Sequence, residues 1–559
     1  MTEHRMPRSF ADRCAAIGQR LRNIDTRVLE LALLALFLGH RLMNLFSYMD
    51  NFLAYIRVHK PDGLSWMNLT AEALRDHFWL SMLYLQQKPP LPNIYHGVML
   101  KLFDAPFPIV WALFIGRFLI SCGLYVLFFR LLLSAGLRRI TAFVAVALFI
   151  LSVDQFLYDM CFNGFHDPLS GLLLLVIIAL CLRYALRRQG RTALLLGLAS
   201  ATLALTREAY MPIALVPLAW VLVAGRGRQL RHALLLLVPV LLLQGGWAVK
   251  NYAVYGYFTL QTTSWGGVNA MVGLDKTGNE EPFIATILED AEDYPEWFVR
   301  MITTEGLVHW HPPYYFYRFM PYDIILRDRM LQTRLHGTNR SENTMGQKIL
   351  SDLYWRAYLR FLRRHPELIL RKFLISYGKY WQPTRYMTHL YSPVIFAVEP
   401  LFENGLDLPM HLELLRQGRI PEQHLVTLDG KDYARANYRT LDLIAYLAYL
   451  FSLVSMHTVA PLATVLALWR IRRRRREDSW PATEQVLLLS MAFWLYSALI
   501  FNLMEDGENV RFRLIVEPVI WLATVSGWLV AWRALPRFRT RPAGSEGRRP
   551  DERAVPRKD

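Results

Sequence analysis

The chain has 559 residues, of which 53% are hydrophobic, and a formal net charge of +17. The apolar residues gather in long, uncharged blocks, which disfavours a water-soluble globular protein. The positive charge falls between these blocks, so it does not by itself indicate nucleic-acid binding.

Apolar segments recur along the chain, and several approach the roughly 20 residues that cross a bilayer. In chain order they are 28–47, 108–133, 140–158, 168–186, 192–206, 209–224, 231–254, 441–469, 484–503 and 514–532. We therefore predict an all-α polytopic membrane protein with about ten transmembrane helices, outer-face interfacial helices and a mixed outer segment. The first segment follows an arginine-rich polar stretch and precedes no small-residue cleavage site, so we expect it to remain as a helix.

Clusters of arginine predict the topology. They lie at 138–139, 183–191, 226–231, 470–476 and after 533. If successive segments cross the membrane in alternate directions, all these clusters fall on one side, which is the positive-inside pattern. We therefore expect both termini to be cytoplasmic and two long loops, 48–107 and 255–440, to lie outside. The charge then requires no nucleic-acid partner.

This topology divides the chain into four parts. They are an N-terminal membrane core with the first outer loop (1–254), an outer segment (255–440), C-terminal transmembrane helices (441–535) and a disordered basic tail (536–559). In the first outer loop, apolar residues at helical spacing predict an interfacial helix. These residues are Leu74, Phe78, Met82 and Leu85. A second interfacial helix is predicted over 353–380, where aromatic residues alternate with basic ones.

Two candidate site residues lie in the first outer loop. Asp50 directly follows the first apolar segment, so a carboxylate there could act as a general base at the outer surface. Lys88 precedes two prolines that hold the backbone extended, and we expect it to meet a lipid phosphate. The structural alternatives are an exposed Asp50 at the membrane edge and a Lys88 that extends its ammonium group to the interface.

Asp167 opens the fourth apolar segment, in the sequence His166-Asp167-Pro168. Asp followed by Pro is a helix-start signal, so capping is a sufficient explanation of this residue. The carboxylate could nevertheless point into a site. His166 beside it could help to bind a divalent metal, although two adjacent ligands are a weak metal signal.

Arginines on the outer side need anionic partners, because the positive-inside pattern disfavours them there. Arg207 follows the fifth segment, and Arg511 and Arg513 precede the tenth. A lipid phosphate is one such partner. Nearby acids are the structural alternative, namely Glu208, Glu505 and Glu508.

Several short motifs, taken in order, resemble the GT-C superfamily of glycosyltransferases that use lipid-phosphate sugars. The nearest similarity is to bacterial relatives of protein O-mannosyltransferases and the lipid A aminoarabinose transferase. The matching stretches are Asp50, Lys88-Pro89-Pro90-Leu91, Asp167-Pro168-Leu169, Leu205-Thr206-Arg207, Lys250-Asn251-Tyr252, Arg364-His365-Pro366-Glu367 and Arg511-Phe512-Arg513.

The resemblance implies an inverting transfer of one sugar from a polyprenyl-phosphate donor at the periplasmic face of a bacterial inner membrane. Asp50 would be the general base, and Lys88, Arg207 and Arg511 would bind the donor phosphate. The acceptor would be a protein, a lipid or a cell-envelope glycan. Arabinose, mannose, aminoarabinose and hexosamine all remain open as the transferred sugar.

One departure from the family pattern concerns a metal. Many members carry two adjacent acids after the first span, whereas Asp50 is followed by Asn51. A divalent metal, if the protein uses one, would then take Asp167, His166 or Asp76 as ligands. The rival function is a transporter or flippase of a lipid-linked or anionic substrate, which the absence of a visible internal repeat disfavours.

Overall fold

A computed structural model gives the fold of the chain. It describes residues 24–47, 69, 71–86, 90–103, 106–152, 166–224, 229–258, 266–275, 278–307, 318–327, 345–381, 426–428, 431–433, 450–473, 480–504 and 509–534. Within these ranges the protein is almost entirely helical, and the only strands are the short antiparallel pair β1 (Val426–Leu428) and β2 (Lys431–Tyr433). The predicted all-α class is therefore confirmed.

Six helices are long and apolar enough to cross a membrane. They are Ile115–Ser134, Asp167–Arg187, Gln229–Tyr255, Leu450–Arg473, Ala482–Leu503 and Ile515–Ala534. Three shorter apolar helices, Arg139–Leu151, Gly190–Thr206 and Glu208–Ala224, accompany them. These lengths support a membrane protein, while the expected total of about ten crossings also requires helices outside the six.

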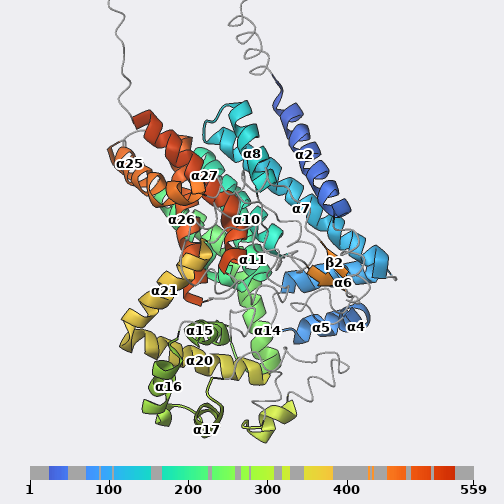
Figure 1. Ribbon diagram of the computed structural model, residues 1–559, viewed down its shortest axis with the longest axis vertical. Helices are drawn as coiled ribbons and strands as arrows, with labels where there is room; N and C mark the ends of the chain where they lie inside the picture. Colours follow the sequence, from blue (N-terminus) through green and yellow to red (C-terminus); the bar gives the residue numbers. More distant parts are fainter. Residues whose placement is uncertain are drawn as a thin grey trace, which may run out of the picture.

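One large hydrophobic core unites the apolar helices into a bundle. Its elements are α2 (Thr26–Ser47), α7 (Pro106–Ser134), α8 (Arg139–Ser152), α10 (His166–Arg187), α11 (Gly190–Thr206), α12 (Leu215–Ala224), α13 (Gln229–Val240), α25 (Val459–Arg473), α26 (Ala482–Met504) and α27 (Asn509–Ala534). Helix α14 (Gly246–Tyr255) follows α13 in the chain, and none of its described residues belongs to this core. Figure 1 shows α10 and α11 near the centre, with α2, α7 and α8 on one flank and α25, α26 and α27 on the other.

Two of the apolar stretches are not regular α-helices. A 3-10 turn, η2 (Glu208–Ala214), contains Pro212 and precedes α12, so the predicted segment 209–224 contains only ten α-helical residues. A π-turn, η3 (Leu241–Gly245), joins α13 to α14 two residues after Pro239. Both irregularities accompany a proline, which lacks the backbone N–H of a regular helix.

Hydrogen bonds join the helix ends that flank the arginine clusters. Arg139 donates to the carbonyl of Ile24 at 3.1 Å, Thr483 donates to the carbonyl of Ala135 at 2.6 Å, and Arg533 donates to Thr483 at 2.7 Å. The Trp220 indole donates to the carbonyl of Cys181 at 3.0 Å, and Arg470 lies 3.6 Å from Glu484. We call this the basic end of the bundle.

A second hydrophobic core lies at the opposite end, which we call the far end (Figure 1). It is built from α15 (Gly266–Asp275), α16 (Glu280–Glu289), η4 (Ala291–Asp293), α17 (Glu296–Glu305), α20 (Met345–Arg364) and α21 (Pro366–Tyr380). Gly267 packs against α20 so closely that a Cβ there would overlap the carbonyl of Ser351, and its own N–H donates to the Ser351 hydroxyl at 3.0 Å. Only glycine permits this approach.

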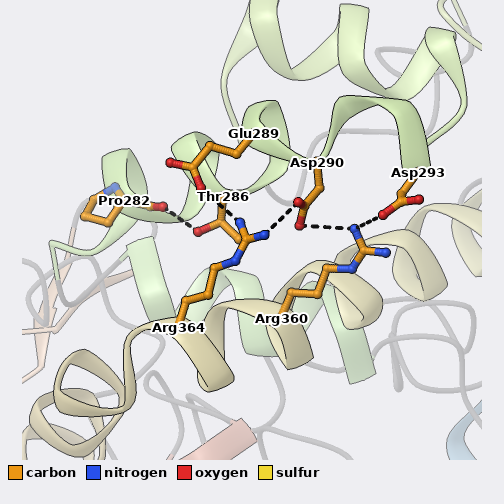
Figure 2. Close-up of polar contacts among 7 residues, drawn as sticks. All are labelled: Pro282, Thr286, Glu289, Asp290, Asp293, Arg360 and Arg364. Carbon is orange, nitrogen blue, oxygen red and sulfur yellow. Dashed lines mark hydrogen bonds and ion pairs between the residues drawn. The ribbon is translucent and has the colours of Figure 1, made fainter.

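Ion pairs tie α20 to α16 and η4 on the surface of this second core. Figure 2 shows Arg364 between Glu289 and Asp290, at 2.9 and 2.7 Å, and Arg360 between Asp290 and Asp293, at 3.1 and 2.7 Å. The Arg364 guanidinium lowers the pKa of the Asp290 carboxyl below its ordinary value. Because the groups other than Asp290 are more than a third exposed, each pair contributes little stability by itself.

The C-terminal end of α26 is hydrogen-bonded to the helices of the second core. Tyr358 donates to the carbonyl of Leu503 at 3.0 Å, and the buried ammonium of Lys372 donates to the same oxygen. The last carbonyls of a helix have no partner within the helix, so these two donors satisfy a group that would otherwise need water. The predicted outer segment thus joins the bundle through α20 and α21.

Both predicted interfacial helices are broken in two. The segment 353–380 bends between α20 and α21, where His365 precedes Pro366, and a residue before proline is disfavoured in the α conformation. The loop segment around Leu74 forms α4 (Ala71–Asp76) and α5 (Phe78–Tyr84), followed by α6 (Pro90–Leu102). Single continuous helices were the wrong prediction at both places.

Candidate functional site

The structure places the sequence-predicted site residues unevenly. Asp50 and Lys88 lie outside the described residues. His166 and Arg511 stand in the first turns of α10 and α27, where their side chains are not described. Asp76 is the last residue of α4 and is exposed.

Two of the predicted residues meet. The guanidinium of Arg207 donates a hydrogen bond to the carboxylate of Asp167, and the two side chains are 9% and 5% exposed. Helices α10 and α11 run antiparallel and are joined by a short turn, so the start of α10 faces the end of α11. Asp167 lies 40 residues before Arg207 in the sequence, whereas the adjacent Glu208 was the expected local partner.

Local structure explains the position of each group. Asp167 lies one residue inside α10, so a role at the helix start is compatible with its ion pair. The backbone of Arg207 is extended, with φ −151° and ψ 122°, and it separates the helix α11 from η2. This interruption of the helical path orients the Arg207 side chain towards α10. Two buried charges are tolerated far from water only when they are paired.

Aromatic rings surround the pair. The Arg207 guanidinium lies 6.0 Å from the centre of the Phe501 ring, within the range of a cation–π contact. Tyr210 packs against Phe501 and Tyr496, with ring centres 5.7 and 6.2 Å apart. The Tyr496 hydroxyl donates to the carbonyl of Ala209 at 2.6 Å, which fixes the start of η2.

A second buried arginine lies on α27. Arg513 donates to Glu517 one turn later, at 3.1 Å, and to the carbonyl of Tyr380 at 3.2 Å. Its guanidinium also lies 5.5 Å from the Trp381 ring. The local partners expected from the sequence, Glu505 and Glu508, lie outside the described residues. Arg513 therefore links α27 to the end of α21.

Tyr380 lies beside the pair of Arg513 and Glu517. It is fully buried, and within the described part of the chain its hydroxyl has no hydrogen-bond partner. Burial raises the pKa of this hydroxyl well above its ordinary value, and Arg513 opposes the shift, while Tyr210 and Glu517 lie near enough to add to it. The hydroxyl is therefore a neutral donor at physiological pH. We call Asp167, Arg207, Tyr210, Tyr380, Arg513 and Glu517 the polar centre.

The chain before Lys88 is held by α14 and the residues after it. Lys250 donates to the carbonyl of Leu85, Tyr255 to that of Tyr84, and the Tyr257 hydroxyl to the side-chain oxygen of Gln86. These contacts bridge about 170 residues of sequence, so no local pattern could have indicated them. They fix the backbone of residues 84–86, shortly before Lys88 in the sequence.

A metal site is not assembled among the described side chains. In that part of the chain, no three His, Cys, Asp or Glu residues cluster as metal ligands. Asp167 is engaged by Arg207, and Asp76 is exposed at the end of α4.

The fold and the polar centre define a class: a helical protein whose described part contains six helices long and apolar enough to cross a membrane, with paired buried charges at one end of the bundle. Comparisons with protein-family models, with curated proteins and with solved structures give no match.

Proposed function

We propose that the protein is a glycosyltransferase of the bacterial inner membrane. It transfers a single sugar from a polyprenyl-phosphate donor to an acceptor at the periplasmic face, with inversion at the anomeric carbon. The observation that supports this most is the buried pair of Arg207 and Asp167 at the far end of the bundle. Ionisable groups buried among membrane helices are costly and commonly mark functional sites.

The distribution of arginine supports the orientation. The basic end is cytoplasmic according to the positive-inside pattern, so the far end and its polar centre face the periplasm. In this orientation the chain crosses the membrane about ten times and both termini lie in the cytoplasm. A lipid phosphate at the outer leaflet would then lie at the level of the polar centre.

Each residue has a distinct role in this proposal. Arg207 binds the donor phosphate, and Asp167 is a positioning residue that orients the guanidinium. A guanidinium carries five N–H donors, so an ion pair with Asp167 is compatible with phosphate binding. Lys88 and Arg511 supply further positive charge, and Asp50 takes the proton of the acceptor hydroxyl as the sugar transfers.

One observation favours the rival function of a flippase. The apolar stretch Gln229–Tyr255 contains Pro239 and the π-turn η3, and transporters commonly use interrupted membrane helices. We favour transfer over transport because the polar centre lies at one end of the bundle, whereas transporter sites usually lie near the midplane.

Reconstitution distinguishes the two functions. The full-length protein is placed in liposomes with a labelled polyprenyl-phosphate sugar and a crude envelope extract as acceptor. Covalent transfer of the label, lost in Arg207→Ala, is the expected result. A matched control is Arg327→Ala, because Arg327 is exposed and distant in sequence from the polar centre. Movement of label across the bilayer without covalent transfer would establish the flippase instead.

A further inference from the structure

Helix α14 carries a fully buried amide, that of Asn251. The helix belongs to the apolar stretch Gln229–Tyr255, which is long enough to cross a membrane. Its outward residues include Val249 and Tyr252, which are 59% and 61% exposed. Its buried residues are Ala248, Asn251 and Tyr255, at intervals of about one turn, and Gln244 in η3, just before the helix, is buried as well. Polar groups buried in a membrane bundle usually serve a ligand or a partner group.

Asn251 is the most unusual of these residues. It is fully buried, and within the described part of the chain neither its amide nitrogen nor its amide oxygen has a hydrogen-bond partner. Burying an amide with both groups unsatisfied is unfavourable, so such a residue requires an explanation. The indole N–H of Trp247, one turn earlier, also has no partner among the described residues.

The neighbours of this face connect it to the proposed donor site. Gln244 donates to the carbonyl of Met211 at 3.5 Å, and Met211 lies in η2, four residues after Arg207. At the other end of α14, Tyr255 donates to the carbonyl of Tyr84, in the segment that leads to Lys88. Asn251 therefore lies along the chain between Gln244 of η3, which contacts η2, and Tyr255 of α14, which contacts that segment.

The unsatisfied groups define the ligand chemistry. A primary amide presents two donors and an acceptor, which match sugar hydroxyls because each hydroxyl both donates and accepts. An ionised phosphate only accepts, and it would leave the amide oxygen unsatisfied. Aromatic residues stand one turn before and one turn after Asn251 on the same helix: the Lys250 ammonium lies 3.6 Å from the centre of the Trp247 ring, and Tyr255 stacks on Tyr257 with ring centres 5.7 Å apart. An amide beside aromatic rings suits a neutral sugar ring.

We infer that Asn251 binds hydroxyl groups of the donor sugar, with the indole N–H of Trp247 as a second donor. This inference rests on the proposed function, because it requires a sugar attached to the phosphate that Arg207 binds. It assigns the recognition of the sugar to α14 and the recognition of the phosphate to Arg207.

Binding to the full-length protein in nanodiscs tests the assignment. The probes are undecaprenyl phosphate alone and undecaprenyl phosphate carrying mannose, arabinose, aminoarabinose or a hexosamine. Asn251→Leu should lower the affinity for the sugar-bearing probe that the wild type prefers. The expected loss is roughly tenfold, as for lost neutral hydrogen bonds, while the affinity for the sugar-free lipid should stay unchanged. Tyr252→Phe, on the outward face of the same helix, is the matched control and should change neither.

Thermal unfolding without ligand provides an independent readout. If Asn251 serves the ligand, Asn251→Leu removes an unsatisfied amide and should leave the thermal midpoint unchanged or raise it. A lowered midpoint with equal weakening of both probes would make Asn251 a structural residue and overturn the inference alone. A wild-type protein that prefers no sugar-bearing probe and transfers no sugar would overturn both the inference and the proposed function.

Discussion

The ion pair between Asp167 and Arg207 predicts a large coupling between two residues that are 40 positions apart. Because the side chains are 5% and 9% exposed, water and salt screen the interaction only slightly. Replacing Asp167 with alanine leaves the Arg207 guanidinium buried without this carboxylate. Breaking a buried pair from one side costs about 3–5 kcal/mol, so we expect that loss in the free energy of unfolding for each single variant.

The double variant Asp167→Ala/Arg207→Ala completes the cycle. It leaves neither charge unpaired, so its loss should be smaller than the sum of the two single losses by about 2–3 kcal/mol. The measurement is unfolding of the full-length protein in mixed micelles, titrated with sodium dodecyl sulfate and followed by tryptophan fluorescence. Losses that add within about 0.5 kcal/mol would refute the pair as an energetic unit.

Asparagine at position 167 separates the ion pair from a capping role. Asn is as good a helix cap as Asp, so capping alone predicts that Asp167→Asn has nearly the wild-type stability. The ion pair predicts a loss comparable with that of Asp167→Ala, because the guanidinium again lacks a charged partner.

Gly267→Val should lower the thermal midpoint, because a Cβ there overlaps a carbonyl of α20, whereas Gly39→Val, with open space around its Cβ, should not. Because Arg364 lowers the pKa of Asp290, the ion-pair network stabilises the second core above about pH 4 and loses this contribution as the pH falls through the lowered pKa. Hydrogen-exchange protection of α16 and α20 should fall over the same pH range in the wild type. In Asp290→Asn the protection should not change over that range. Asp50→Asn should slow transfer about 10²–10⁴-fold while donor affinity persists in a binding assay.

Hydropathy predicted the helical class because it is a local property of the chain. The predicted span 484–503 corresponds to α26, Ala482–Met504, and the predicted span 168–186 falls within α10, His166–Arg187. Local irregularities were harder to predict. The span 209–224 begins with a 3-10 turn at Pro212, and 353–380 divides at Pro366, although proline is a recognised breaker in both cases.

The composition of the polar centre could not be predicted from local sequence. Arg207 was identified, but its neighbour Glu208 was proposed as the alternative partner because adjacent charges are the only ones that one sequence displays. The pairing with Asp167 requires the antiparallel arrangement of α10 and α11. Tyr380 carries no motif at all, and only its burial beside Arg513 reveals it.

The two buried arginines differ in the groups that accept their hydrogen bonds. Arg513 binds the carbonyl of Tyr380 at the end of α21 and Glu517 on its own helix, so its hydrogen bonds attach the second core to the bundle. Arg207 pairs with the carboxylate of Asp167 at the start of α10, and its own extended backbone separates α11 from η2. A ligand that displaced Arg513 from its carbonyl would also release a helix end. Since a phosphate could share Arg207 without this cost, we propose Arg207 as the donor-binding residue and Arg513 as the structural one.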